Sequence, residues 1–193
     1  MRGKNIAIRP GAIVLTLVLM GISTLFAGLC AAYLYTLIST RVDAPRPPIL
    51  FLLNIPVLLS ATLVLKKSLS AFDNKSYRHM VKYQVFCLCL TLVFIILQIL
   101  GWTQVFHEIP LTASQARSFL FVLSALHLLH VFAGIPFLFW CIWMNRGDIN
   151  QLRYFFDHRR GYLQGLKRYW NYLDILWILL VMILSIGFAL KWL

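Results

Sequence analysis

Five long apolar segments dominate this sequence of 193 residues. They cover residues 12–38, 48–66, 81–102, 118–143 and 170–192. Each approaches or exceeds the roughly 20 apolar residues that a helix needs to cross a bilayer. Within the hydrocarbon layer the backbone must satisfy its own hydrogen bonds, and a helix does so internally. The sequence therefore predicts an all-α integral membrane protein, a bundle of five transmembrane helices that forms a single membrane domain over residues 1–193.

Composition supports this prediction, since 61% of the residues are hydrophobic and only 12% are charged. Ordinary soluble domains carry about 25% charged residues. The first apolar run is longer than the hydrophobic region of a usual signal peptide, and no convincing cleavage site follows it. We expect this run to stay in the protein as a helix, and we expect no sizeable soluble domain beside the bundle.

The lysines and arginines are distributed unevenly between the two sides of the predicted bundle. Fourteen fall in the amino-terminal segment and in the links after spans two and four, and four fall on the other side. Short loops rich in Lys and Arg stay in the cytoplasm, so we predict a cytoplasmic amino terminus and a periplasmic or outside carboxyl terminus. We expect the basic residues behind the net charge of +12 to set the orientation of the helices and to contact anionic lipid. We expect no nucleic-acid binding.

Two histidines stand out in the fourth span. His127 and His130 are three residues apart, which places them on one face of a helix. They could ligate a haem or a metal, carry protons, or donate hydrogen bonds to neighbouring helices. A metal site would need further ligands from other spans, and no matching pattern of Cys or acidic residues is present. We favour the packing role.

The fifth span contains Asp174 three residues after Asn171. Asp174 could relay protons, or it could accept hydrogen bonds from Asn171 or from a partner helix, and we favour this structural role. Polar groups inside a membrane are costly, so each needs a partner or a function. On this reasoning we expect Asn54 to bond across helices. We expect Gln98 and Trp102 to make a helix contact at the outer end of span three.

Small residues and cysteines have simpler interpretations. Gly28 and Ala32 form a small-xxx-small pair, which allows two helices to approach closely. Cys87 and Cys89 point to nearly opposite sides of a helix, so we predict neither a disulfide nor a metal site. The sequence contains no nucleotide-binding loop, catalytic triad spacing or metal-binding cysteine set, and we find no catalytic centre in it.

Several segments, in order, resemble subunit III of the haem–copper oxidases. These are residues 25–33 (LFAGLCAAY), 53–60 (LNIPVLLS), Gln98 with Trp102, 123–131 (LSALHLLHV) with Gly134, and 169–177 (YWNYLDILW). The last two segments are the most specific. The residues that carry the motifs are Gly28, Tyr33, Asn54, Gln98, Trp102, His127, His130, Gly134, Trp170, Asn171, Asp174 and Trp177.

The sequence departs from the family pattern at three places. Asn171 stands where the family has a histidine, and Gly101 stands where an acid often follows the glutamine of span three. The carboxylate that many members carry in the first of these spans is also missing. The resemblance is to the short bacterial form with five spans.

The resemblance implies a non-catalytic subunit of a cytochrome c oxidase, an enzyme that reduces oxygen to water and translocates protons. Haem and copper would reside in subunits I and II, while this chain would bind phospholipid and support proton uptake. A wider respiratory supercomplex is a further possible partner. The location would be the bacterial inner membrane, as a multi-pass protein. His79 and His158 are candidates for a proton-collecting surface.

Three other interpretations stay open at this point. Subunit III of a quinol oxidase, or an accessory chain of a nitric oxide reductase, would look much alike, because the electron-donor site lies on other subunits. A small stand-alone transporter would need a continuous polar path through the spans. A haem-binding cytochrome would use His127 or His130 as a ligand.

Overall fold

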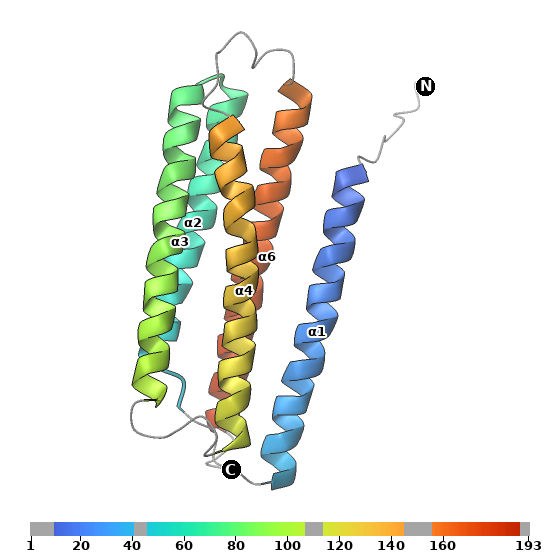
Figure 1. Cartoon of the computed structure of the whole chain (residues 1–193), viewed down its shortest axis with the longest axis vertical. Coiled ribbons are helices and arrows are strands. Elements are labelled where there is room, and N and C mark those ends of the chain that lie inside the picture. Colours follow the sequence, from blue (N-terminus) through green and yellow to red (C-terminus); the bar gives the residue numbers. More distant parts are fainter. Residues whose placement is uncertain (1–9, 41–45, 107–113, 145–155, 190–193) are drawn as a thin grey trace.

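The computed structural model describes residues 10–40, 46–106, 114–144 and 156–189. They form five long helices: α1 (Pro10–Thr40), α2 (Ile49–Asp73), α3 (Tyr77–Phe106), α4 (Gln115–Met144) and α6 (Phe156–Ala189). All five are long and apolar enough to cross a membrane, as the sequence predicts. Successive helices run in opposite directions, and the described residues contain no strand (Figure 1).

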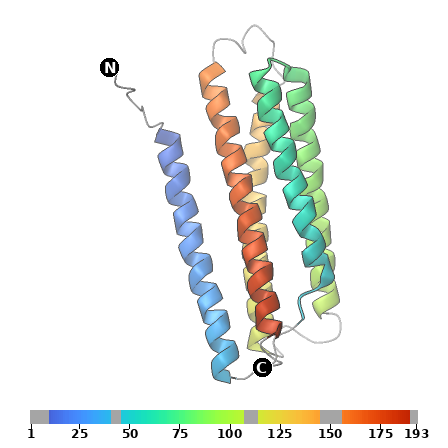
Figure 2. The same ribbon diagram turned by 180° about the vertical axis from the view of Figure 1, so that it is seen from behind.

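Helices α2, α3, α4 and α6 form a four-helix unit, and α1 lies at its edge. The helices α2 and α3 form an antiparallel hairpin, α3 also packs on α4, and α6 packs on both α2 and α4. Within the described residues, helix α1 makes substantial contacts only with α4 and α6. Both views show its first turns standing away from the other helices (Figures 1 and 2). A lone helix can occupy this position because lipid solvates its remaining apolar surface.

Side-chain burial divides the bundle into a packed interior and a lipid-facing exterior. The buried side chains include Phe26 and Tyr33 of α1, which join the core of the four-helix unit. Large apolar side chains such as Leu63, Leu129 and Ile175 point outward and are more than half exposed. In water this exterior would be costly, whereas hydrocarbon solvates it.

The connection between α2 and α3 is a tight turn that ends α2. The amide N–H of Ser76 donates to the carbonyl oxygen of Ala71, and that of Lys75 donates to Phe72. This is the Schellman arrangement, which requires a left-handed residue just after the helix. Lys75 occupies that position with φ 58°. The hairpin therefore turns within three residues, and α2 and α3 stay together along their length.

The helices extend beyond several of the predicted membrane spans. Helix α6 begins at Phe156, fourteen residues before the span predicted from residue 170. Helix α2 runs past residue 66 to Asp73, and α3 begins at Tyr77 rather than at residue 81. Apolar runs mark only the part of a helix inside hydrocarbon, while basic residues continue the helix into the headgroup region. At 1.5 Å per residue, helices of 25 to 34 residues exceed the roughly 30 Å hydrocarbon layer.

Candidate functional site

The candidate site is the interior of the four-helix unit, where most of the polar motif residues are buried. At one level the side-chain amides of Asn54 on α2 and Gln98 on α3 meet, with Asn54 Nδ2 donating to Gln98 Oε1 at 3.2 Å. Both side chains are fully buried. The prediction that Asn54 bonds across helices is confirmed. The bond ties α2 to α3 inside the bundle.

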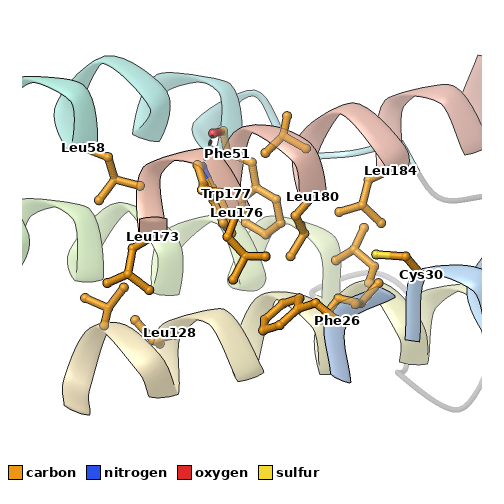
Figure 3. Packing of buried hydrophobic residues seen from close by; sticks show 14 of the residues in the cluster. Phe26, Cys30, Phe51, Leu58, Leu128, Leu173, Leu176, Trp177, Leu180 and Leu184 are labelled. Atoms are coloured by element: carbon orange, nitrogen blue, oxygen red, sulfur yellow. Dashed lines mark hydrogen bonds between the residues drawn. The ribbon is translucent and has the colours of Figure 1, made fainter. Parts of the chain in front are cut away.

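His127 lies at the centre of an aromatic group. Its ring is 4.9 Å from that of Trp177 and 5.8 Å from that of Phe94, between centroids. The imidazole is fully buried, and neither ring nitrogen has a hydrogen-bond partner among the described residues. Trp177 Nε1–H donates to the backbone oxygen of Phe51 at 3.2 Å, which links α6 to α2 (Figure 3). The rings of Trp177 and Phe94 thus pack directly against the buried imidazole.

His130 has different surroundings from His127. Its Nδ1 lies 2.6 Å from the carbonyl oxygen of Leu126, one turn earlier on the same helix. Its ring packs edge-on against Phe26 of α1 at 5.8 Å, and Tyr169 Oη–H donates to its backbone oxygen at 2.7 Å. The two histidines therefore do not form a joint site. One is enclosed in the core, and the other helps to attach α1 and α6 to α4.

Asp174 and Asn171 also separate in the structure. Asp174 is only 4% exposed and lies near the Thr62 hydroxyl, but the two groups do not meet in hydrogen-bond geometry. Asn171, three residues earlier, is exposed on the outside of α6. No hydrogen bond between Asn171 and Asp174 forms within the described residues. The expected structural role of Asp174 through Asn171 therefore finds no support in the geometry.

The remaining motif residues of α3, α4 and α6 make close helix contacts. Trp102 Nε1–H donates to the hydroxyl oxygen of Ser124 at 2.9 Å, so the expected contact at this end of α3 joins it to α4. Gly134 allows α6 to approach, because a Cβ there would lie 2.8 Å from Tyr169 and 3.0 Å from Trp170. Trp170 itself is buried against this glycine. The motif residues thus fix the spacing of the bundle.

On α1, the motif residues divide between core and surface. Tyr33 is fully buried and packs edge-on against Phe119 of α4. Gly28 is exposed, and a Cβ built there would meet nothing within 4 Å. The small-xxx-small contact expected at Gly28 and Ala32 is therefore not made within the described residues. The face of α1 with Gly28 points away from the bundle.

The two surface histidines are only partly described. His79 is exposed in the first turn of α3. The backbone of His158 belongs to the first turn of α6, while its side chain lies outside the described part. Both turns lie at the end of the bundle that carries Lys66, Lys67, Lys75, Arg78, Lys82, Arg160, Lys167 and Arg168, which we call the basic end.

An ion pair at the basic end was not predicted. Arg160 on α6 donates to both carboxylate oxygens of Asp73 on α2, at 2.8 and 3.2 Å. The side chains are 44% and 40% exposed, so the pair contributes no more than about 1 kcal/mol. The two residues are far apart in the sequence and belong to no motif. No local signal could have paired them.

Beyond the predicted residues, α3 carries a regular polar stripe. Gln84, Thr91 and Gln98 recur at intervals of seven residues, and all three are fully buried. A seven-residue spacing returns to nearly the same helix face, so the pattern was visible in the sequence. Gln98 bonds to Asn54, so the stripe lies on a buried side of α3 that faces α2.

Cysteine placement agrees with the sequence interpretation. Cys87 is buried and Cys89 is exposed, which confirms that the two thiols point to different sides of α3. In the part of the chain that the structure describes, no three His, Cys, Asp or Glu side chains come together as metal ligands would.

Comparison with known proteins agrees with this architecture. The family model for cytochrome c oxidase subunit III matches residues 13–187. A cytochrome c oxidase subunit 3 from Synechocystis sp. (strain ATCC 27184 / PCC 6803 / Kazusa) is 28% identical over 172 residues, which cover 85% of this chain and 70% of the relative. The family match extends over all five helices and every motif residue discussed above. The chain belongs to the cytochrome c oxidase subunit III family.

Proposed function

We propose that this chain is the non-catalytic subunit III of a cytochrome c oxidase, a respiratory terminal oxidase that reduces oxygen to water and translocates protons. The observation that carries the proposal is the family match over residues 13–187. The lipid-facing exterior and the enclosed His127 add support, because they suit a packing subunit better than a redox protein. Haem and copper would belong to subunits I and II, which would hold this chain in the complex.

Purification of the tagged chain in mild detergent tests this role. We expect a larger subunit that contains haem and copper to co-purify, and we expect cytochrome c to be its electron donor. A preference for quinol would make the chain subunit III of a quinol oxidase, and nitric oxide reduction would make it an accessory chain of a reductase. A Soret band from the isolated chain, or solute transport by the isolated chain in vesicles, would contradict the non-catalytic role.

We propose further that the basic end faces the cytoplasm of a bacterium, with the chain in its inner membrane. Lys and Arg gather beside spans on the cytoplasmic side of membrane proteins. Single cysteines in a background without the native ones test the orientation. Ser76→Cys lies at the basic end and Ser39→Cys at the opposite end, and both positions are exposed. An impermeant maleimide added to intact cells should label the second and not the first; the reverse result would invert the topology.

The basic end is also where we propose contact with phospholipid. Lys66, Lys67 and Arg78 are exposed there, and each cation near a surface of anionic lipid contributes about 1 kcal/mol of attraction. Native mass spectrometry of the purified complex should detect bound anionic phospholipid. The double variant Lys66→Gln/Lys67→Gln should bind less of it than the wild type. Equal lipid retention would exclude these two lysines as the contact.

Support of proton uptake is the last part of the proposal. A histidine titrates near neutral pH, so exposed imidazoles at the uptake side can collect protons. The variant His79→Gln/His158→Gln should slow proton uptake by the assembled oxidase, measured with a pH dye in vesicles. His107→Gln is the matched control, since the sequence places His107 on the other side of the membrane. Unchanged uptake in the double variant would remove these histidines from the proposal.

A further inference from the structure

The polar stripe of α3 lies against further buried polar groups that are not paired. Within the described residues, no hydrogen-bond partner exists for either ring nitrogen of His127, for Oδ1 of Asp174, for the Thr62 hydroxyl, or for either side-chain amide atom of Gln84. We call these four residues the interior polar set. Together they leave six buried polar atoms without a partner.

The members of this set are neighbours along the axis of the four-helix unit. Asp174 lies near Thr62 and also interacts electrostatically with Cys87, which is three residues from Gln84 on the same helix. His127 contacts the ring of Trp177, which is three residues from Asp174 on α6. Three residues correspond to about 4.5 Å along a helix. The four residues therefore lie at successive heights along the axis of the four-helix unit, inside the same core.

Leaving these atoms unpaired would be costly. A buried donor or acceptor without a partner costs about 1–3 kcal/mol, and native interiors pair the great majority of such groups. Water is the usual solution, since an internal water molecule makes about three hydrogen bonds to polar groups that lack other partners. Apolar voids stay dry, but this interior offers donors and acceptors together: a carboxylate, a hydroxyl, a carboxamide and an imidazole.

Apolar side chains close this interior at both ends. Phe72, Met80 and Leu163 pack together at the basic end. Towards the opposite end, Phe51 and Phe94 pack edge-on against Trp177. A continuous pore would not have such closures. We propose that the core of the α2–α3–α4–α6 unit is an enclosed site for internal water molecules, which bridge Asp174 and Thr62 and hydrogen-bond to Gln84 and His127.

Radiolytic footprinting of the purified complex tests the proposal, because hydroxyl radicals generated from bound water oxidise the side chains beside it. The chain provides a matched pair of reporters: Cys87 and Cys141 have the same chemistry and are both fully buried. Both thiols belong to one apolar cluster with Leu138 and Ile142, but only Cys87 also interacts electrostatically with Asp174. We expect severalfold faster oxidation of Cys87. Equal rates would overturn the proposal.

Two further measurements keep the test decisive. Thr62→Val keeps the side-chain shape but removes the hydroxyl, so it should lower the Cys87 rate towards that of Cys141. Ser68→Ala is the control, because the Ser68 hydroxyl already donates to the Met80 backbone oxygen. A density map of the wild-type complex should show water about 2.8 Å from Asp174 Oδ1 and from a nitrogen of His127. A dry map, or oxidation of Met80 as fast as that of Cys87, would reject an enclosed water site.

Discussion

At the scale of single residues, the two motif glycines Gly134 and Gly28 have opposite surroundings. A Cβ at Gly134 would lie 2.8 Å from Tyr169 Cε1 and 3.0 Å from the Trp170 ring. Both neighbours are large rings held between helices, so they cannot yield without moving α6. A Cβ at Gly28 would meet nothing within 4 Å. Close packing of α6 therefore requires a glycine at Gly134, whereas no contact within the described residues requires one at Gly28.

This contrast gives a paired prediction. Gly134→Ala should lower the free energy of unfolding by about 1–3 kcal/mol, because overpacking forces neighbouring side chains and backbone to shift. Gly28→Ala should leave the free energy unchanged or raise it by up to about 1 kcal/mol, since alanine favours the helix. Unfolding of the purified chain in mixed detergent micelles measures both. Equal effects of the two substitutions would contradict the close approach of α6 to Gly134.

Trp177 supports a second residue-scale prediction. Its indole N–H links α6 to the Phe51 carbonyl, and its ring fills the space between Phe94 and His127. Trp177→Phe removes the hydrogen bond and part of the ring, and it should destabilise the chain by about 1–3 kcal/mol. Trp140 is 53% exposed and faces outward, so Trp140→Phe is the control with little effect. A difference below the error of the unfolding titration would show that the bond is not important.

The sequence predicts some of these side-chain roles and not others. Asn54 could be predicted to bond across helices, because a lone amide in hydrocarbon must find a partner. Its partner Gln98 could not be identified, since that depends on the rotation of α3 relative to α2. The same limit applies to His127 and His130. Their spacing places them close together on a helix, but only packing decides that one contacts Trp177 and the other Phe26.

At the scale of elements, the hairpin of α2 and α3 depends on one residue in an unfavourable conformation. Lys75 has φ 58°, a left-handed backbone that costs about 1–2 kcal/mol for a residue with a Cβ. Lys75→Gly should therefore raise the free energy of unfolding by about 1 kcal/mol while keeping both Schellman hydrogen bonds. The thermal unfolding midpoint in detergent reports the change.

The neighbouring Asn74 is the control for this substitution. It has φ −83°, which an ordinary residue adopts without strain. Asn74→Gly should therefore lower the unfolding midpoint, since glycine only adds freedom to the unfolded chain. Stabilisation by both glycines would show that a general increase in loop flexibility, and not the relief of strain at Lys75, is responsible.

Helix existence and helix length differ in how well the sequence predicts them. Apolar runs of sufficient length predict all five helices, because the hydrocarbon layer imposes a minimum length. The run from Phe156 to residue 169 lies outside the predicted fifth span, since its basic and aromatic residues have low hydropathy. The structure continues α6 through this run and joins it to α2 by the Arg160–Asp73 pair. Hydropathy indicates which part of a helix lies in hydrocarbon. It does not indicate where the helix begins or ends.

At the scale of the whole molecule, α1 is attached to a four-helix unit that holds the polar interior without it. Its attachments include a hydrogen bond between the Ser23 and Tyr172 hydroxyls, the edge-on contact of Phe26 with His130, and the packing of Tyr33 near Gly187. The asymmetry was not predictable, because α1 is as apolar as the other spans and lipid can replace a neighbouring helix. A change at one of these attachments should therefore move α1 and leave the rest of the bundle in place.

Gly187 gives the sharpest test of this division. A Cβ there would lie 2.6 Å from Tyr33 Oη and 2.9 Å from Leu37 Cδ1, and Phe119 limits any movement of the Tyr33 ring. Gly187→Ala should push α1 away from α6 at this end. Spin labels at Ser39→Cys and Ile186→Cys, both exposed, should report a longer and broader distance distribution. Gly165→Ala is the matched control, because its Cβ would make only an ordinary contact at 3.8 Å with Leu15. An unchanged distribution in Gly187→Ala would show that α1 and the four-helix unit behave as one body.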